Sequence, residues 1–362
     1  MNEFPKVAII YLAYHPDEFL DEVVAGWKKI AYSHDRVKIV IVENPHPQLG
    51  LSTEAIRAKV LSLSGQEIPE VVYLPQEKNL GFAGGNNVGL RWAMEQGFDY
   101  AFLNNQDGYV EARTVSVLVE KAESDSKLGA VQALVVLPEK PERIDTAGNF
   151  LHYLGFGYSG QHGELLSDFK PRPQIGYASG AALFIKLSIA KEVGLLDEDL
   201  FLYHEDLEYT LRLRAFGYDV ALAPEAIFFH HHEFVKSTGK WYFMERNRFA
   251  VMLEYYHWGT WLLILPMLIL VEIGVWLMAL TKGFYREKWR AKMYWLNLDH
   301  WKLWLGKRRA LMNRRKLSDR ELLEWFTGDL RFNFLAKENF IIRLGSLVLR
   351  IYWLLIKPLI FW

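Results

Sequence analysis

The chain has 362 residues, about half of them hydrophobic, so it can form two domains or one large domain with an appendage. It has no cysteine, which excludes disulfides and thiolate metal sites and fits a reducing compartment. The net charge is −1, but residues 282–316 carry twelve Lys and Arg against two acids, a local +10 that leaves −11 elsewhere. This asymmetry predicts contact with an anionic surface. No basic run follows Met1, so no signal peptide is expected.

Short apolar runs alternate with amphipathic stretches through the first two thirds of the chain. Strands are predicted over residues 6–14, 37–42, 71–74, 100–103, 129–137, 175–185, 220–223 and 227–229. Helices are predicted over 18–31, 79–96 and 204–215, with a flap or hairpin at 143–160. Strands that alternate with helices predict an α/β fold with a mostly parallel sheet, in which ligands bind at the carboxyl ends of the strands.

Polar residues follow several of these strands. The segment 79–89, NLGFAGGNNVG, opens a helix, and its glycines allow a phosphate to approach the helix N-terminus. A glycine-rich turn with asparagine caps is an equal alternative, since the dinucleotide spacing G-x-G-x-x-G is absent. Asp107 follows the strand 100–103 among amides, an oxygen-rich setting that suits Mg²⁺ or Mn²⁺ bound with a diphosphate. Taken alone, an Asp-Gly turn explains it as well.

The stretch 194–232 has an unusual density of ionisable side chains. Glu205 and Asp206 begin a helix, where the helix dipole stabilises acids, and either could be a catalytic base. The triplet His230 to His232 follows the last strand and could contribute to a metal site or form a solvated loop.

The chain resembles the GT-A glycosyltransferases of family two, and within them the bacterial rhamnosyltransferase-like branch. The resemblance rests on five segments that occur in the order seen in that family: 79–89, 105–107, 176–182, 197–212 and 224–230. The resemblance covers residues 6–235. It implies a GT-A fold, with a Rossmann-like, mostly parallel sheet flanked by helices. It also implies a catalytic domain at 1–240, and the change in composition after it predicts a helical, membrane-associated region at 241–362.

The resemblance assigns roles to individual residues. Asp206 would be the general base, with Glu205 as the second candidate. Asp107 would be the remaining carboxylate of a D-x-D metal motif, and His230 would complete the shell around Mg²⁺ or Mn²⁺. Arg212 would lie near the diphosphate or brace the Glu205–Asp206 turn. The other residues on the donor side would be Tyr14, Glu43, Asn79, Gly81, Asn86, Asn87 and Asn105.

The implied reaction is an inverting transfer from a nucleotide-diphosphate sugar to a hydroxyl group. It needs a carboxylate that takes the hydroxyl proton and a cation that offsets charge on the leaving diphosphate. Two alternatives remain. A non-catalytic nucleotide-sugar-binding relative would explain why Asn105 replaces the first acid of the metal motif. A nucleic-acid-binding protein would use the basic stretch 282–316 but leaves the acidic site unexplained.

The last third is apolar and basic. Residues 258–280 are long enough to span a bilayer, with Pro266 and Glu272 inside, although a buried core helix is the alternative. The basic stretch 282–316 contains tryptophans and would bind anionic lipid headgroups rather than nucleic acid. Arg343, Arg350 and Lys357 share one face of a predicted in-plane helix.

Topology refines the membrane prediction. Nucleotide sugars are cytosolic, so the catalytic domain is expected there. One crossing at 258–280 would place the +10 segment outside, against the positive-inside tendency. We therefore expect a re-entrant or interfacial helix broken near Pro266, at the cytoplasmic face of the cell membrane. A lipid-linked saccharide, such as a polyprenyl-diphosphate sugar, is the expected acceptor.

Overall fold

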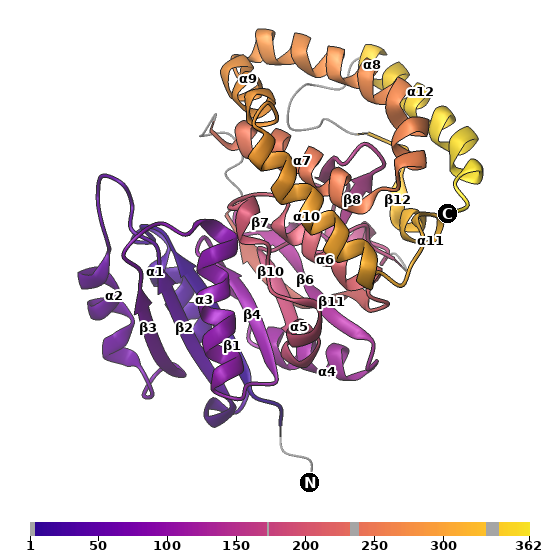
Figure 1. The fold of residues 1–362 in the computed structure, drawn as a ribbon. Coiled ribbons are helices and arrows are strands. Elements are labelled where there is room, and N and C mark those ends of the chain that lie inside the picture. The colour runs from indigo at the N-terminus through magenta and orange to yellow at the C-terminus, as the bar shows by residue number, and fades with distance from the viewer. Residues whose placement is uncertain (1–3, 172–173, 232–238, 331–339) are drawn as a thin grey trace.

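The computed structural model describes residues 4–171, 174–231, 239–330 and 340–362 (Figure 1). The strands are β1 (Val7–Ala13), β2 (Val37–Glu43), β3 (Glu70–Pro75), β4 (Tyr100–Asn105), β5 (Gly108–Val110), β6 (Leu128–Leu137), β7 (Lys140–Thr146), β8 (Asn149–His152), β9 (Gly157–Ser159), β10 (Ala182–Lys186), β11 (Asp219–His230) and β12 (Phe326–Thr327). The α-helices are α1 (Leu20–Trp27), α2 (Thr53–Lys59), α3 (Gly81–Glu95), α4 (Thr114–Glu123), α5 (Leu187–Val193), α6 (Glu205–Ala215), α7 (Lys240–Tyr255), α8 (Trp258–Lys282), α9 (Tyr285–Tyr294), α10 (Leu298–Arg314), α11 (Asp319–Leu322) and α12 (Phe340–Ile356).

Strands β1 to β7, β10 and β11 form one sheet. Its order is β3-β2-β1-β4-β10-β6-β11-β5, with β7 paired to β6. The first four strands in this order are mutually parallel, as predicted, and β6 and β11 are also parallel. Strand β10 is antiparallel to both of its neighbours, so the sheet is mixed.

Hydrophobic cores lie on both faces of this sheet. In β1, Ile10 packs into the core under α3, α5 and α6, while Ile9 packs into the core under α1, α2 and α4. Alternate side chains of a strand point to opposite faces, so a strand buried on both sides reads as an unbroken apolar run. This explains why the short apolar runs in the sequence predicted buried strands.

Three predicted segments differ in detail. Residues 220–229 form one strand, β11, and Pro224 lies at a register shift between Ala223 and Ile227, where the missing N–H costs no ladder bond. Of residues 175–185, the strand begins only at Ala182. The flap at 143–160 contains β8 and β9, and β8 pairs with both β9 and β12 in a second, three-stranded sheet.

Helices α7 to α12 lie together at one end of the large sheet (Figure 1). The prediction that the apolar helix breaks near Pro266 is wrong, because α8 runs from Trp258 to Lys282 without interruption. A proline removes one bond to the carbonyl four residues earlier, here that of Leu262. Pro266 and Leu262 are both exposed, so α8 passes this point with its inner, protein-facing side intact.

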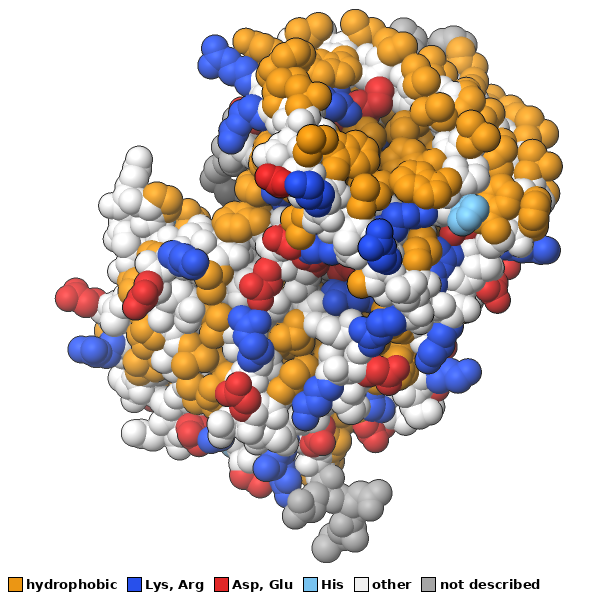
Figure 2. Space-filling model, in the orientation of Figure 1, with side chains coloured by type: hydrophobic (Ala, Val, Ile, Leu, Met, Phe, Trp, Pro, Cys, Tyr) orange, Lys and Arg blue, Asp and Glu red, His pale blue; other side chains and the backbone are white. Residues whose placement is uncertain are grey.

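Helix α8 has a protein-facing side and an exposed side. Its inner residues Ile264, Leu268, Val275 and Ala279 recur at helical spacing and are buried. Its exposed apolar residues are Leu262, Leu265, Ile269, Leu270, Ile273, Leu277 and Leu280. Among the described residues, α8 is the helix long and apolar enough to cross a membrane. Figure 2 shows hydrophobic side chains gathered over the C-terminal helices.

The acid within α8 is compensated by cations from neighbouring helices. Glu272 pairs with Arg248 of α7, and its other oxygen lies 3.1 Å from Lys288 Nζ and 2.8 Å from Lys292 Nζ of α9. Glu245 of α7 lies 2.7 Å from the same Lys288 ammonium. Burial alone would raise the pKa of Glu272, but the three cations lower it to about 2. We call these five residues the ion-pair cluster; it binds α8 to α7 and α9.

Candidate active site

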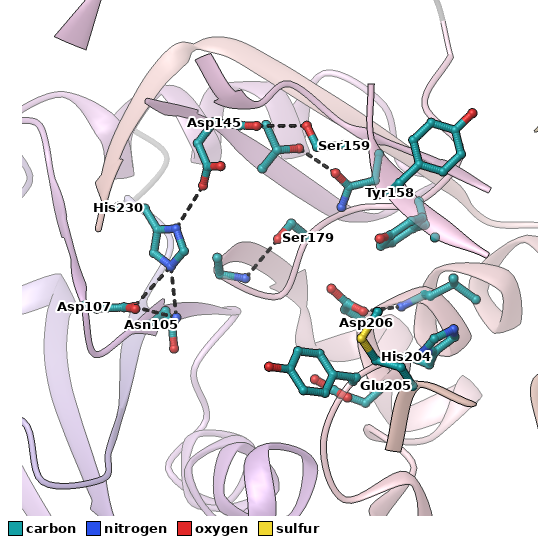
Figure 3. Close-up of a pocket in the computed structure, with 18 residues that line it drawn as sticks. Asn105, Asp107, Asp145, Tyr158, Ser159, Ser179, His204, Glu205, Asp206 and His230 are labelled. Carbon is teal, nitrogen blue, oxygen red and sulfur yellow. Dashed lines mark hydrogen bonds and ion pairs between the residues drawn. The ribbon is translucent and has the colours of Figure 1, made fainter. Parts of the chain in front are cut away.

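A cavity of about 330 Å³ lies at the carboxyl end of β4, between the large sheet and α6. Two groups of polar side chains face it from opposite sides (Figure 3). One contains Asn105, Asp107, Asp145 and His230, and the other contains His204, Glu205 and Asp206. Met244 of α7 also lines the cavity, together with Thr146, Asn149, Gly157, Tyr158, Ser159, Tyr177, Ser179, Ala181, Tyr203 and Leu207.

The first group brings together residues from three strands. Asp107 follows β4, and its Oδ1 lies 3.1 Å from His230 Nε2, at the end of β11. Antiparallel pairing of His230 with Gly108 sets this contact. Asn105 Nδ2 donates to Asp107 Oδ1 at 2.6 Å. The sequence separates Asp107 and His230 by 123 residues, and the sheet topology places them side by side.

Asp145 of β7 is a member of this group that sequence reasoning missed. Its Oδ2 lies 2.9 Å from His230 Nδ1, and its Oδ1 lies 3.0 Å from His162 Nδ1. Burial alone would lower the pKa of His230, but hydrogen bonds to Asp107 and Asp145 raise it to about 10. A carboxylate bound to one ring nitrogen orients the other. In the sequence, Asp145 stands out only as an acid followed by small residues, within the segment predicted to be a flap.

The second group contains the two candidate bases. Asp206 accepts backbone N–H bonds from Gly180 at 2.9 Å and from Leu207 at 2.7 Å. Glu205 is 5% exposed, and its Oε2 has no hydrogen-bond partner among the described residues. Burial raises the pKa of both acids, and the charge of Asp206 raises that of Glu205 further. Because the two N–H donors stabilise its charged form, Asp206 is the member of the pair that ionises first.

The loop before α6 has a strained backbone. Phe201, Tyr203 and His204 have φ values of 65°, 64° and 71°, in the left-handed region that non-glycine residues rarely adopt. Such conformations cost about 1–3 kcal/mol each and cluster at functional sites. His204 Nε2 lies 3.3 Å from the carbonyl oxygen of Gly155, which anchors the loop to the segment after β8.

Tyr14 and Glu43 lie at the ends of β1 and β2, as predicted from the strand pattern. The Tyr14 ring contacts that of His46, with 5.3 Å between centroids. Glu43 is fully buried, and its carboxylate accepts bonds from the Ser52 N–H and, at 2.5 Å, from the Tyr73 hydroxyl. In this structure Glu43 therefore binds protein donors with both oxygens.

The asparagines of segment 79–89 bind neighbouring backbone. Asn79 Oδ1 accepts from the Gly81 N–H at 2.8 Å, and Asn86 Nδ2 donates to the Phe82 carbonyl at 2.9 Å. Asn87 exchanges two bonds with the backbone of Leu196. Gly81 has a φ of +72°, and a Cβ there would lie 2.4 Å from the Phe201 carbonyl oxygen. This glycine is required by the close approach of the strained loop to α3.

Arg212 lies away from the cavity that contains the candidate bases. It is in the third turn of α6 and lines a separate cavity with Glu254 and Lys307. Its Nη2 donates to Glu208 Oε2 at 2.8 Å and to the Leu195 carbonyl at 2.6 Å. In the structure Arg212 therefore braces α6 against the segment that follows α5.

His231 also lies outside the cavity. Its ring nitrogens lie 2.6 Å from Glu22 and 2.8 Å from Glu139, both on the surface. His232 falls outside the described residues.

The first group fits a divalent ion as a pair of ligands. Asp107 Oδ1 and His230 Nε2 lie 3.1 Å apart and are joined by a hydrogen bond, whose proton a divalent ion bound by both atoms would displace. The described residues contain no group of three His, Asp or Glu side chains that could hold an ion. The remaining ligands of an ion here would therefore be oxygens of the donor diphosphate and water.

Comparisons with known proteins agree with the architecture. Galactofuranosyltransferase GlfT1 from Mycobacterium tuberculosis is 28% identical over 232 residues, which cover 59% of this chain and 72% of that protein. Low-salt glycan biosynthesis hexosyltransferase Agl10 from Haloferax volcanii is 22% identical over 151 residues, or 40% of this chain and 47% of the relative. The mannosyltransferase PcManGT from Pyrobaculum calidifontis, solved with GDP-Man and Mn²⁺, has a TM-score of 0.53, 12% identity and 86% coverage of both chains.

The mixed sheet with flanking helices defines a GT-A glycosyltransferase fold, which the likeness to the mannosyltransferase confirms. Residues 9–194 match the family model of glycosyl transferase family 2, and the chain belongs to this family. It is a glycosyltransferase that uses a nucleotide-sugar donor. The rhamnosyltransferase-like branch stays a prediction.

Proposed function

We propose that this enzyme transfers a sugar, with inversion, from a nucleotide-diphosphate donor to a hydroxyl group of a lipid-linked saccharide at the cytoplasmic face of the membrane. One observation supports the reaction above all. A single cavity has the pair Asp107 and His230 on one side and the pair Glu205 and Asp206 on the other (Figure 3). This separates a site for the leaving diphosphate from a site for the attacking hydroxyl.

Asp206 is the proposed general base. A base must be ionised when the acceptor binds, and two backbone N–H groups stabilise the charge of this carboxylate. Each of its oxygens keeps a second lone pair that can accept the acceptor hydroxyl. As the hydroxyl oxygen attacks the anomeric carbon, its proton passes to Asp206 and the bond to the diphosphate breaks. Glu205, buried beside it, is the second candidate.

Asp107 and His230 are the proposed ligands of Mg²⁺ or Mn²⁺. Bound there, the ion would offset the charge that develops on the leaving diphosphate. Asp145 orients His230 so that Nε2 faces Asp107. Asn105, where relatives with a D-x-D motif have an acid, donates to Asp107 and thereby fixes its carboxylate. The Mn²⁺ in the mannosyltransferase structure agrees with this proposal.

The C-terminal region is the proposed membrane-docking surface. The exposed apolar residues of α8 continue onto α12, whose Tyr352 hydroxyl donates to the Leu263 carbonyl at 2.6 Å. Exposed apolar residues on α12 are Leu344, Leu347, Val348, Ile351, Leu354 and Leu355. A soluble surface rarely exposes so many neighbouring apolar side chains. Beside them lies the +10 stretch 282–316, which would attract anionic headgroups.

An interfacial position explains α8 better than a crossing. Its inner face packs on protein from Ile264 to Ala279, and Glu272 is bound by three cations of α7 and α9. A helix with one protein face and one apolar face lies in the membrane surface. An enzyme docked in this way meets acceptors anchored in the lipid, which supports a lipid-linked substrate.

A donor screen tests the reaction. UDP-, GDP- and dTDP-sugars are tested by thermal shift with Mg²⁺ or Mn²⁺, and release of the nucleoside diphosphate is then measured. We expect one donor to raise the melting temperature only with a divalent ion, since a ligand stabilises the state that binds it. If no nucleotide sugar is bound or consumed with either ion, the proposed reaction is wrong.

A topology experiment tests the location. Sealed membrane vesicles of either orientation are treated with protease, and cleavage within residues 282–316 is measured. We expect cleavage only when the cytoplasmic face is outside. Cleavage from the opposite face alone would contradict an interfacial α8.

A further inference from the structure

The loop that presents the candidate bases contains a strained γ-turn. The N–H of Leu202 donates to the Leu200 carbonyl at 2.7 Å, and Phe201 between them has φ 65° and ψ −58°. This form of the γ-turn is rare because it places a non-glycine residue at positive φ. Tyr203 and His204 follow with positive φ, and Glu205 begins α6 directly after them.

Helix α3 binds one side of this loop. The Phe201 carbonyl accepts bonds from the N–H groups of Phe82 at 2.7 Å and Ala83 at 3.2 Å, both in the first turn of α3. These N–H groups have no partner within the helix, so the loop satisfies them.

Helix α7 binds the other side through one amide. Nδ2 of Asn247 lies 2.9 Å from the Leu200 carbonyl, 3.0 Å from that of Leu202 and 2.6 Å from that of Tyr203. Asn247 is fully buried. The carbonyls of residues 200–203 therefore all have donors from α3 or α7. The neighbouring Arg246 adds bonds to the carbonyls of Asp199 and Leu200 at 2.8 Å.

We propose that Asn247 is a positioning residue of the transfer reaction, which fixes the γ-turn so that Glu205 and Asp206 face the cavity. An asparagine suits this place because its NH₂ group donates two hydrogens, while its length matches the gap between α7 and the loop. Aspartate has no donor, and leucine would leave buried carbonyls unpaired. The proposal rests on the proposed function in one respect, that the base is one of these two acids.

The proposal also gives the C-terminal region a part in the chemistry. Asn247 and the cavity residue Met244 lie on the same helix, α7, three positions apart. The helix is bound in turn to α8 and α9 by Glu245 and Arg248 of the ion-pair cluster. Helix α7 thus connects the region proposed to dock on the membrane with the loop before the candidate bases.

The test compares Asn247→Leu and Asn247→Gln with the wild-type full-length enzyme. The measurement is nucleoside-diphosphate release from the donor that the wild type consumes fastest, with kcat and the KM for donor separated. Leucine keeps the volume without donors, and we expect kcat to fall on the order of 100-fold, as for a displacement of about 1 Å at reacting groups. The KM for donor should stay within about threefold, because Asp107 and His230 are untouched.

Val251→Ala is the matched control, since it removes buried packing of α7 in the main core and an apolar side chain donates nothing to the loop carbonyls. We expect it to lower the melting temperature and leave kcat unchanged. If Asn247→Leu does not fold, Asn247→Gln, which keeps the amide but displaces it by one methylene, replaces it with an expected kcat loss on the order of tenfold. A folded Asn247 variant with wild-type kcat, or equal kcat losses for the Asn247 and Val251 variants, overturns the positioning role. Asp206→Asn in the same assay reports separately on the proposed base.

Discussion

The two halves of this glycosyltransferase both bury pairs of carboxylates, but they treat them in opposite ways. In the C-terminal region, Glu245 and Glu272 are surrounded by cations, and the pKa of both is lowered although burial acts to raise it. At the cavity, no ion pair joins Glu205 or Asp206 to a cation among the described residues, and burial raises both pKa values. Carboxylates that are paired with cations stay ionised and join neighbouring helices, whereas buried carboxylates without a cation beside a cavity are candidates for a functional site.

Asp206→Asn should produce the largest effect. The amide keeps the size of the side chain but cannot take a proton, so we expect transfer to fall by about 10²–10⁴-fold, the usual contribution of a general base. Nucleotide binding, measured by calorimetry, should change only a few-fold. Glu205→Gln is compared in parallel. If Asp206→Asn keeps its activity and Glu205→Gln loses it, the base is Glu205.

Glu272→Gln should be the most destabilising change in the C-terminal region. It leaves Arg248 and Lys288, which are 1% and 0% exposed, with Glu245 as the one remaining carboxylate of the ion-pair cluster. Breaking a buried ion pair from one side costs about 3–5 kcal/mol, measured here by urea unfolding at pH 7. Asp299→Asn is the control, since its pair with Lys302 is exposed, and it should change stability by less than about 1 kcal/mol.

The loss of stability in Glu272→Gln should also depend on pH, in a direction that the lowered pKa sets. A carboxyl with a lowered pKa stabilises the fold above its unfolded value, and the contribution is lost as pH falls through the folded value. The difference between wild type and Glu272→Gln should therefore be largest above about pH 4.5 and shrink toward about pH 2. A difference that does not vary with pH would contradict the ion-pair account.

The exposed face of α8 should determine membrane affinity but not stability. Ile269→Ser with Ile273→Ser removes two exposed apolar side chains, 53% and 56% accessible, that pack on no core. We expect partition into phosphatidylcholine–phosphatidylglycerol vesicles to fall by about tenfold or more, since each such side chain gains about 1.5–3 kcal/mol when fully buried. Leu49→Ser, equally exposed in the N-terminal half, should change nothing. Equal vesicle binding by both would exclude α8 as the docking surface.

The smallest effect should be a gain in stability. Glu205→Gln removes a buried carboxylate whose Oε2 has no hydrogen-bond partner among the described residues, and we expect unfolding at pH 7 to cost about 1 kcal/mol more than in the wild type. A raised pKa weakens the fold as pH rises above the unfolded value, so the gain should vanish near pH 4 and grow toward neutrality. A destabilised Glu205→Gln at pH 7 would remove the contrast between the two regions.

Much of the N-terminal half could be predicted from sequence because its signals are local. An unbroken apolar run predicts a strand buried on both faces, and the segment 79–96 predicted the helix α3. The pattern also placed Asp107 at the end of a strand and Glu205 in the first turn of a helix. Their roles came from the resemblance to family two and stay proposals.

Tertiary structure decided what surrounds these residues. Asp145 contacts His230 across 85 positions of the chain, and Asn247 binds carbonyls 44 to 47 positions earlier. Arg212 shares a helix with Asp206 but points into another cavity, because its position on α6 lies on a different face. Pro266 led to the prediction of a break in the apolar helix, but α8 is continuous and Pro266 lies on its exposed side. Periodicity specifies elements one by one, whereas contacts between distant segments depend on how the elements pack.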